Sequence, residues 1–141
     1  MDINLKEIPH DFFDPPIVVG GKAMEFYGIR KSGYDIDLIV SLRDFKALLS
    51  KMPEQAGKID MDSYIRYSCF EIWSSIRQFD YDFYVKEAVF RDIYYVMSIE
   101  RLVWMKGLYV SEPKSVRDLD LISKYVMKIK YKDYRKSLTT K

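Results

Sequence analysis

Residues 17–40 read IVVGGKAMEFYGIRKSGYDIDLIV, and two apolar runs in this stretch, IVV and LIV, bracket a pair of glycines and a pair of aspartates. An apolar run that ends in glycines is typical of a buried strand followed by a turn. Asp35 and Asp37 are two residues apart, so that on a strand both side chains project from one face. Two carboxylates at this spacing are unfavourable in an apolar core, and they therefore indicate a functional site.

The composition is that of a globular protein. Of its 141 residues 48% are hydrophobic and 31% charged, and we expect a single domain over residues 1–141. The one cysteine, Cys69, excludes an internal disulfide, and the one histidine, His10, argues against His-based metal sites and Ser-His-Asp triads. No apolar run approaches the roughly 20 residues that span a bilayer, and the first residues do not resemble a signal peptide. We therefore expect a cytoplasmic protein without a membrane partner.

Charge is unevenly distributed along the chain. Residues 101–141 hold eleven Lys or Arg against four Asp or Glu, whereas residues 1–100 hold twelve against seventeen. Four cations near the end recur at roughly helical spacing: Lys124, Lys128, Lys132 and Arg135. A basic segment of this kind suits a polyanionic partner such as RNA or tRNA, and a solvated helix face explains it equally well.

Strand-like and helix-like patterns alternate along the chain. After an irregular leader at residues 1–16, strands are expected at residues 17–19, 35–41, 64–76 and 79–85. Helices are expected at residues 22–30, at 42–52, from Ser98 onward, and as a basic C-terminal helix at about 116–141. This interleaving predicts an α/β (α+β) layered fold.

The helix that follows Ser98 has a recognisable start and a predicted buried face. Serine is a favourable N-cap, and an acidic residue, Glu100, lies in the first turn. We expect the buried face of this helix to hold four apolar residues: Ile99, Leu102, Val103 and Met105.

The two aspartates suit a hard divalent cation. Like charges this close favour protonation unless a cation lies between them, and Mg²⁺ is bound by one or two carboxylates together with substrate phosphates. A third carboxylate, from Asp80 or Asp82 in FDYDFYV, would complete a two-metal site. Gly20 and Gly21, at a strand-to-helix junction, would let phosphate approach backbone N–H groups. This combination predicts chemistry on a nucleoside triphosphate such as ATP, although each motif alone is common by chance.

The stretch GGKAMEFYGIRKSGYDIDLIV resembles the signature of the DNA polymerase β-like nucleotidyltransferase superfamily. It is most similar to small bacterial nucleotidyltransferase-like proteins, including AbiEii-type toxins, in which a Gly-x-Arg-x-Ser/Thr run precedes Asp-h-Asp. Here Gly28 and Arg30 match the start of that run, and Lys31 and Gly33 are additional spacing residues before the aspartates. The resemblance implies a small mixed β-sheet flanked by helices, with the site on one face of the sheet.

The resemblance also implies a reaction and its residues. A nucleoside monophosphate would move from NTP to a hydroxyl, and pyrophosphate would be released. Asp35, Asp37 and Asp82 would bind Mg²⁺, Asp82 being preferred to Asp80 as the third carboxylate and as the group that helps to deprotonate the acceptor. The triphosphate would face Gly20, Gly21 and Lys22.

A second, looser similarity to this family lies in the segment SIERLVWMKGLYVSEPKSVRDLDL. It implies that Lys106 and Asp118 either contact the nucleotide or have a structural role. Both residues are explained equally well as charges that favour a helix dipole.

Three functions remain open on the sequence. The first is a metal-dependent nucleotidyltransferase whose acceptor is RNA, a protein or a small molecule. The second is a catalytically inactive protein of the same fold that acts as a binding partner, such as a toxin–antitoxin component. The third is a nucleotide-sugar glycosyltransferase, which also uses Asp-x-Asp with a metal but leaves Gly20 and Gly21 unexplained.

Overall fold

A mixed β-sheet forms the centre of the molecule. The computed structural model describes residues 1–134. Its seven-stranded sheet has the order β3-β4-β5-β2-β1-β9-β8, in which β2 and β5 are parallel, β1 and β9 are parallel, and the other neighbours are antiparallel. The strands are β1 (Ile17–Val19), β2 (Ile36–Ile39), β3 (Ala56–Ile59), β4 (Asp62–Tyr67), β5 (Phe70–Trp73), β8 (Val89–Arg91) and β9 (Tyr94–Val96). Strands β6 (Ser75–Ile76) and β7 (Phe79–Asp80) form a separate hairpin.

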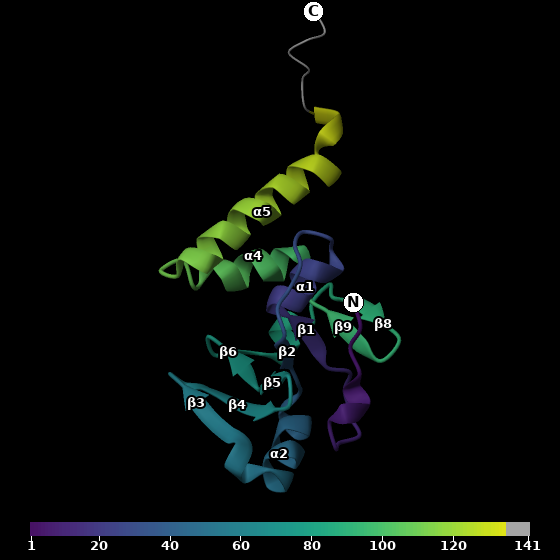
Figure 1. Ribbon diagram of the computed structural model, residues 1–141, viewed down its shortest axis with the longest axis vertical. Helices are drawn as coiled ribbons and strands as arrows, with labels where there is room; N and C mark the ends of the chain where they lie inside the picture. Colours follow the sequence, from purple (N-terminus) through teal and green to yellow (C-terminus); the bar gives the residue numbers. More distant parts are fainter. Residues whose placement is uncertain (135–141) are drawn as a thin grey trace, which may run out of the picture.

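Helices surround this sheet. They are α1 (Gly20–Phe26), α2 (Leu42–Lys51), α3 (Tyr81–Tyr84), α4 (Ile99–Gly107) and α5 (Pro113–Ile129), with short 3-10 turns η1 (Leu5–Glu7), η2 (Pro53–Gln55) and η3 (Lys132–Tyr134). Helices α4 and α5 lie together at one end of the molecule, and α2 lies at the opposite end (Figure 1). The expected α/β fold with a mixed sheet flanked by helices is confirmed.

Serine side chains cap the starts of α2 and α4. The Ser41 hydroxyl accepts the Asp44 N–H at 3.2 Å at the start of α2, and the Ser98 hydroxyl accepts the Arg101 N–H at 3.0 Å at the start of α4. Each bond satisfies a backbone donor that has no partner within its helix. Pro53 follows the end of α2, as expected from a residue that cannot continue a helix.

Two of the expected strands are wrong in extent. Residues 64–76 do not form one strand but include most of β4, all of β5 and β6, with a turn at Ser68 that has a φ of 54°. Residues 79–85 contain only the two-residue β7 before the chain enters α3. The Asp80 side chain caps that helix by accepting the Phe83 N–H at 3.3 Å, so Asp80 and Asp82 do not share a strand face.

The last helix also differs from the expectation. It begins at Pro113, which occupies the first helical position where its missing N–H costs nothing, and it ends at Ile129. Residues 135–141, and with them Arg135, lie outside the described part of the chain. Within residues 1–134 no helix is long and apolar enough to cross a membrane.

Candidate active site

Asp37 and Glu71 lie next to each other on neighbouring parallel strands. The register of β2 and β5 pairs these two residues directly, and the register of β1 and β2 pairs Asp37 with Val19. Neighbours in register on one sheet face have side chains about 5 Å apart. Asp37 is half-buried, and its Oδ1 is the single buried side-chain oxygen or nitrogen without a hydrogen-bond partner in residues 1–134.

The electrostatics of this carboxylate pair are unfavourable without a cation. Burial raises the pKa of the Asp37 carboxyl above its ordinary value, and the neighbouring carboxyl groups of Glu71 and Asp35 raise this pKa further. The Lys106 ammonium opposes this rise. Two acidic groups that close must share either a proton or a cation.

Gly20 places the start of α1 against the Asp37 carboxylate. It follows β1 directly, with a φ of 62° that L side chains rarely adopt, and an added Cβ would lie 3.1 Å from Asp37 Oδ2. Gly21 differs, because an added Cβ would lie at an ordinary 3.4 Å from the Ser32 Cβ. The close approach of backbone to carboxylate therefore requires glycine only at position 20.

A buried ion-pair network joins the loop after α1 to α4 and α5. Asp118 accepts two hydrogen bonds from the Arg30 guanidinium, at 2.7 and 2.9 Å, and a third contact from Lys106 Nζ at 2.9 Å. Burial alone would raise the pKa of Asp118, but hydrogen bonds from Arg30 and Lys106 lower it to about 2. Asp118 thus remains charged and holds Lys106 in place.

These groups meet in one cleft of about 210 Å³. Its lining residues are Val19, Gly20, Gly21, Asp37, Glu71, Trp73, Ile76, Met105, Lys106, Tyr109, Glu112, Lys114 and Ser115. Asp37 and Glu71 line the cleft from the sheet, and Lys106, Glu112 and Lys114 line it from α4 and the start of α5. Trp73 and Tyr109 add aromatic surface. A cleft with acidic, cationic and aromatic walls suits a ligand that has phosphates and a planar ring.

The structure separates some residues that the sequence groups together. Asp35 is exposed, directly precedes β2, and acts on Asp37 through its charge. Asp82 is exposed on α3 and does not line the cleft. The expectation that a strand carries it is wrong, because residues 81–84 form a helical turn. Lys22 does not line the cleft either and donates to the Gly33 carbonyl at 3.0 Å.

Glu71 is the site residue that sequence reasoning missed. In β5, Phe70 and Ile72 are buried, and Glu71 with Trp73 faces the other side. A carboxylate inside a strand-like run of aromatic and β-branched residues could have indicated a site residue. Whether Glu71 lies beside Asp37, however, depends on which strand pairs with β2, and only the tertiary structure shows that pairing.

The residues fit one hard cation held by two carboxylates. Within residues 1–134 no group of three or more His, Cys, Asp or Glu side chains is arranged to hold a metal ion. Mg²⁺ is commonly bound by one or two carboxylates and completes its shell with water and substrate phosphate. The buried, unpartnered Oδ1 of Asp37 beside Glu71 matches that mode.

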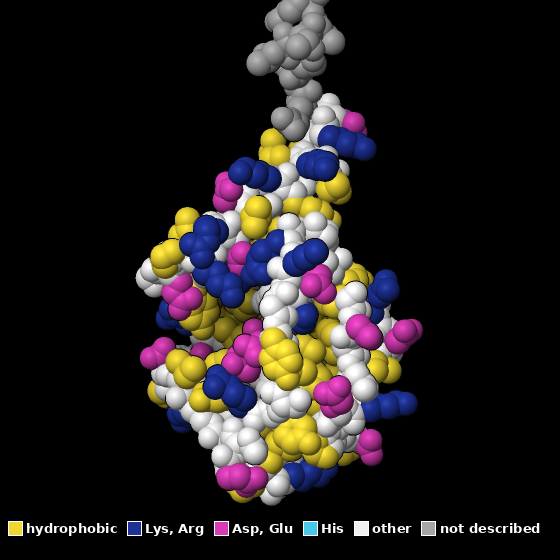
Figure 2. Space-filling view, in the orientation of Figure 1, with side chains coloured by type: hydrophobic (Ala, Val, Ile, Leu, Met, Phe, Trp, Pro, Cys, Tyr) yellow, Lys and Arg dark blue, Asp and Glu magenta, His cyan; other side chains and the backbone are white. Residues whose placement is uncertain are grey.

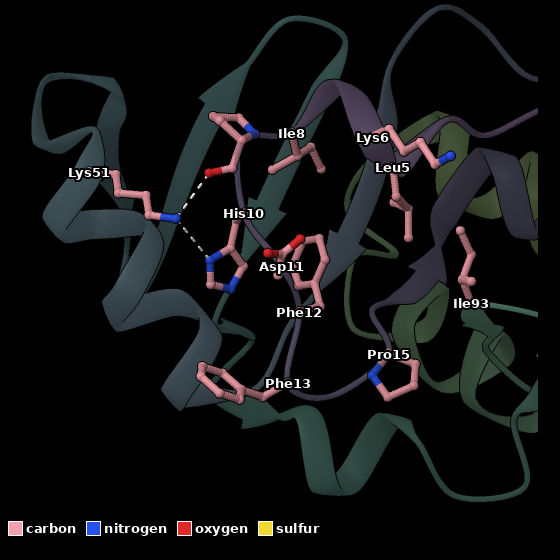
Figure 3. Close-up of a pocket in the computed structure, with 11 residues that line it drawn as sticks. Leu5, Lys6, Ile8, His10, Asp11, Phe12, Phe13, Pro15, Lys51 and Ile93 are labelled. Carbon is pink, nitrogen blue, oxygen red and sulfur yellow. Dashed lines mark hydrogen bonds between the residues drawn. The ribbon is translucent and has the colours of Figure 1, made fainter.

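A larger hollow, of about 730 Å³, lies elsewhere on the molecule (Figure 3). It is bounded by the N-terminal segment, by Lys51 of α2 and by Ile93, and none of its lining residues lines the cleft. In it Lys51 Nζ donates to the Pro9 carbonyl at 3.1 Å. His10, at its edge, is bonded through Nε2 to Asp44 at 2.8 Å, so the single histidine has a structural role.

Comparison with protein-family models, with curated proteins and with solved structures gives no match for this chain.

Proposed function

We propose that the protein is a cytoplasmic, metal-dependent nucleotidyltransferase that moves a nucleoside monophosphate from NTP to a hydroxyl acceptor and releases pyrophosphate. The observation that carries the proposal is the register pair of Asp37 and Glu71. It lies beside the glycine that starts α1 and in one cleft with Lys106. The resemblance of residues 20–40 to the polymerase β-like signature supports the same reaction.

Each wall of the cleft has a part in this proposal. Asp37 and Glu71 would hold Mg²⁺, which neutralises phosphate charge and orients the triphosphate when it is bound. Lys106, fixed by Asp118 at 2.9 Å, would pair with a phosphate oxygen. The acceptor oxygen forms a bond to the α-phosphorus, the bond from that phosphorus to the pyrophosphate oxygen breaks, and the hydroxyl proton passes to the carboxylate pair.

The test is transfer of label from each of the four NTPs, labelled at the α-phosphate, in the presence of Mg²⁺ with total RNA, with total protein or with neither. We expect label in one acceptor fraction with the parent chain and none with Asp37→Ala. Transfer that persists in Asp37→Ala would contradict the assignment of the site.

One observation favours a second candidate function, that of an inactive nucleotidyltransferase-fold partner such as a toxin–antitoxin component. Within residues 1–134 no three carboxylates are arranged to hold metal ions, whereas a two-metal site uses three. Calorimetry with ATP and Mg²⁺ separates the two candidates. Binding of the nucleotide without any label transfer supports the inactive protein, and binding with transfer supports the enzyme.

A further inference from the structure

An apolar groove lies between the first turns of α4 and the last turns of α5, with a volume of about 690 Å³. Its apolar lining residues are Ile99, Val103, Tyr125, Val126, Ile129 and Tyr131. Val103 is 41% exposed, Ile129 56% and Tyr131 42%. The expectation that Val103 belongs to the buried face of α4 is therefore wrong for the single chain.

The groove carries one charge of each sign. Glu100 lines it from α4, and Lys130 lines it from the C-cap of α5. Both residues are exposed, and neither forms an ion pair with another residue of the described part of the chain. The rim of the groove is thus acidic on one helix and basic on the other.

We propose that a second copy of this chain covers the groove and forms a two-fold symmetric dimer of α4–α5 pairs. A two-fold interface needs a surface that complements itself. Here apolar residues of α4 and of the end of α5 line one groove, with an acidic rim on α4 and a basic rim at the end of α5. Two copies placed antiparallel would pack α4 of each against the end of α5 of the other, and Glu100 then faces Lys130 of the partner subunit.

The charges favour a second copy over a nucleic acid. Figure 2 shows Lys and Arg side chains gathered over α5 among hydrophobic ones. Lys124 and Lys128, however, border a different hollow, together with Ser123 and Met127. The groove itself pairs one carboxylate with one ammonium on an apolar floor, which offers a polyanion no net attraction.

None of the described residues lines both the groove and the cleft. The inference therefore does not depend on the proposed function, and each can fail without the other.

The experiment is sedimentation velocity of the full chain over a dilution series. We expect the parent chain to sediment with the mass of two chains at high concentration and to dissociate on dilution. Val103→Glu and Ile129→Glu are both expected to weaken the dimer at least about a hundredfold, because each buries an unpaired charge at the interface. Val116→Glu is the matched control, since Val116 is 52% exposed on α5 outside the groove.

A charge exchange tests the geometry. Glu100→Lys and Lys130→Glu should each weaken the dimer about tenfold, because like charges then meet twice across the two-fold axis. The double variant should regain the affinity of the parent within about threefold. A parent chain that stays monomeric at every concentration overturns the proposal, as does a dimer that all of these substitutions leave intact. Thermal unfolding of each variant confirms that the single chains remain folded.

Discussion

Asp37 of β2 and Glu71 of β5 are direct partners across a parallel strand pair, and the Oδ1 atom of Asp37 is buried without a hydrogen bond. In most sheets such a position holds an apolar or hydroxyl pair, because like charges opposite each other destabilise the strands. A fold that keeps two carboxylates here tolerates an electrostatic cost that a bound cation would remove. This relationship motivates the first prediction.

Glu71→Gln should reduce the rate of label transfer by at least about a hundredfold, because the cation loses one of its two carboxylates. Asp82→Asn should leave the rate within about threefold of the parent, since Asp82 lies on α3 and outside the cleft. Single-turnover transfer from labelled NTP measures both. A large loss in Asp82→Asn with none in Glu71→Gln would restore the site expected from the sequence and remove the one described here.

The two glycines at the start of α1 should respond to alanine in opposite directions. Gly20→Ala should lower the free energy of unfolding by about 1 to 2 kcal/mol, because alanine is strained at a φ of 62° and its Cβ crowds Asp37 Oδ2. Gly21→Ala should raise it by up to about 1 kcal/mol, because its Cβ meets only ordinary contacts and alanine favours a helix. Urea unfolding distinguishes the two; equal effects would mean that position 20 carries no special constraint.

Asp118→Asn should destabilise the fold by about 3 kcal/mol at neutral pH, since it leaves Arg30 and the buried Lys106 without a counter-charge. The pKa of Asp118 is lowered to about 2 in the folded chain, so its stabilising effect is complete above the ordinary carboxyl pKa of about 4. That effect is lost as the pH falls from about 4 toward 2. Urea unfolding at several pH values should therefore show the difference between parent and variant shrinking over this interval, and a constant difference would contradict the ion-pair account.

Asp44→Ala should destabilise the chain by about 3 kcal/mol. Asp44 is fully buried and accepts hydrogen bonds from His10, from the backbone N–H groups of Phe13 and Asp14, and from the Ser41 hydroxyl. Alanine leaves these donors without their acceptor. Ser41→Ala, which removes the cap of α2 and only one of the donors to the Asp44 carboxylate, is the control and should cost about 1 kcal/mol in the same urea experiment. Equal losses would mean that Asp44 serves only the cap.

Local patterns in the sequence were sufficient for much of the fold. The apolar run before Gly20 predicted β1, the spacing of Phe45 and Leu48 predicted α2, and Ser98 predicted the start of α4. These elements follow from short-range physics: period, capping and the absence of proline. The residues of FDYDFYV also alternate like a strand, but the Asp80 side chain caps a helical turn there, and this local bond overrides the period.

The candidate site shows most clearly which features follow from the local sequence and which depend on the tertiary structure. The sequence by itself determined that Gly20 and Asp37 belong to one strand–helix–strand unit, because both lie in one continuous stretch with a readable pattern. Only the tertiary structure decided that the second carboxylate is Glu71, that Asp118 binds Arg30 and Lys106, and that Val103 is exposed. The physical reason is that strand pairing and helix packing join residues that are 34 and 88 positions apart in the sequence. The local pattern of apolar residues does not specify which strand pairs with which, or which opposite charge a residue will contact.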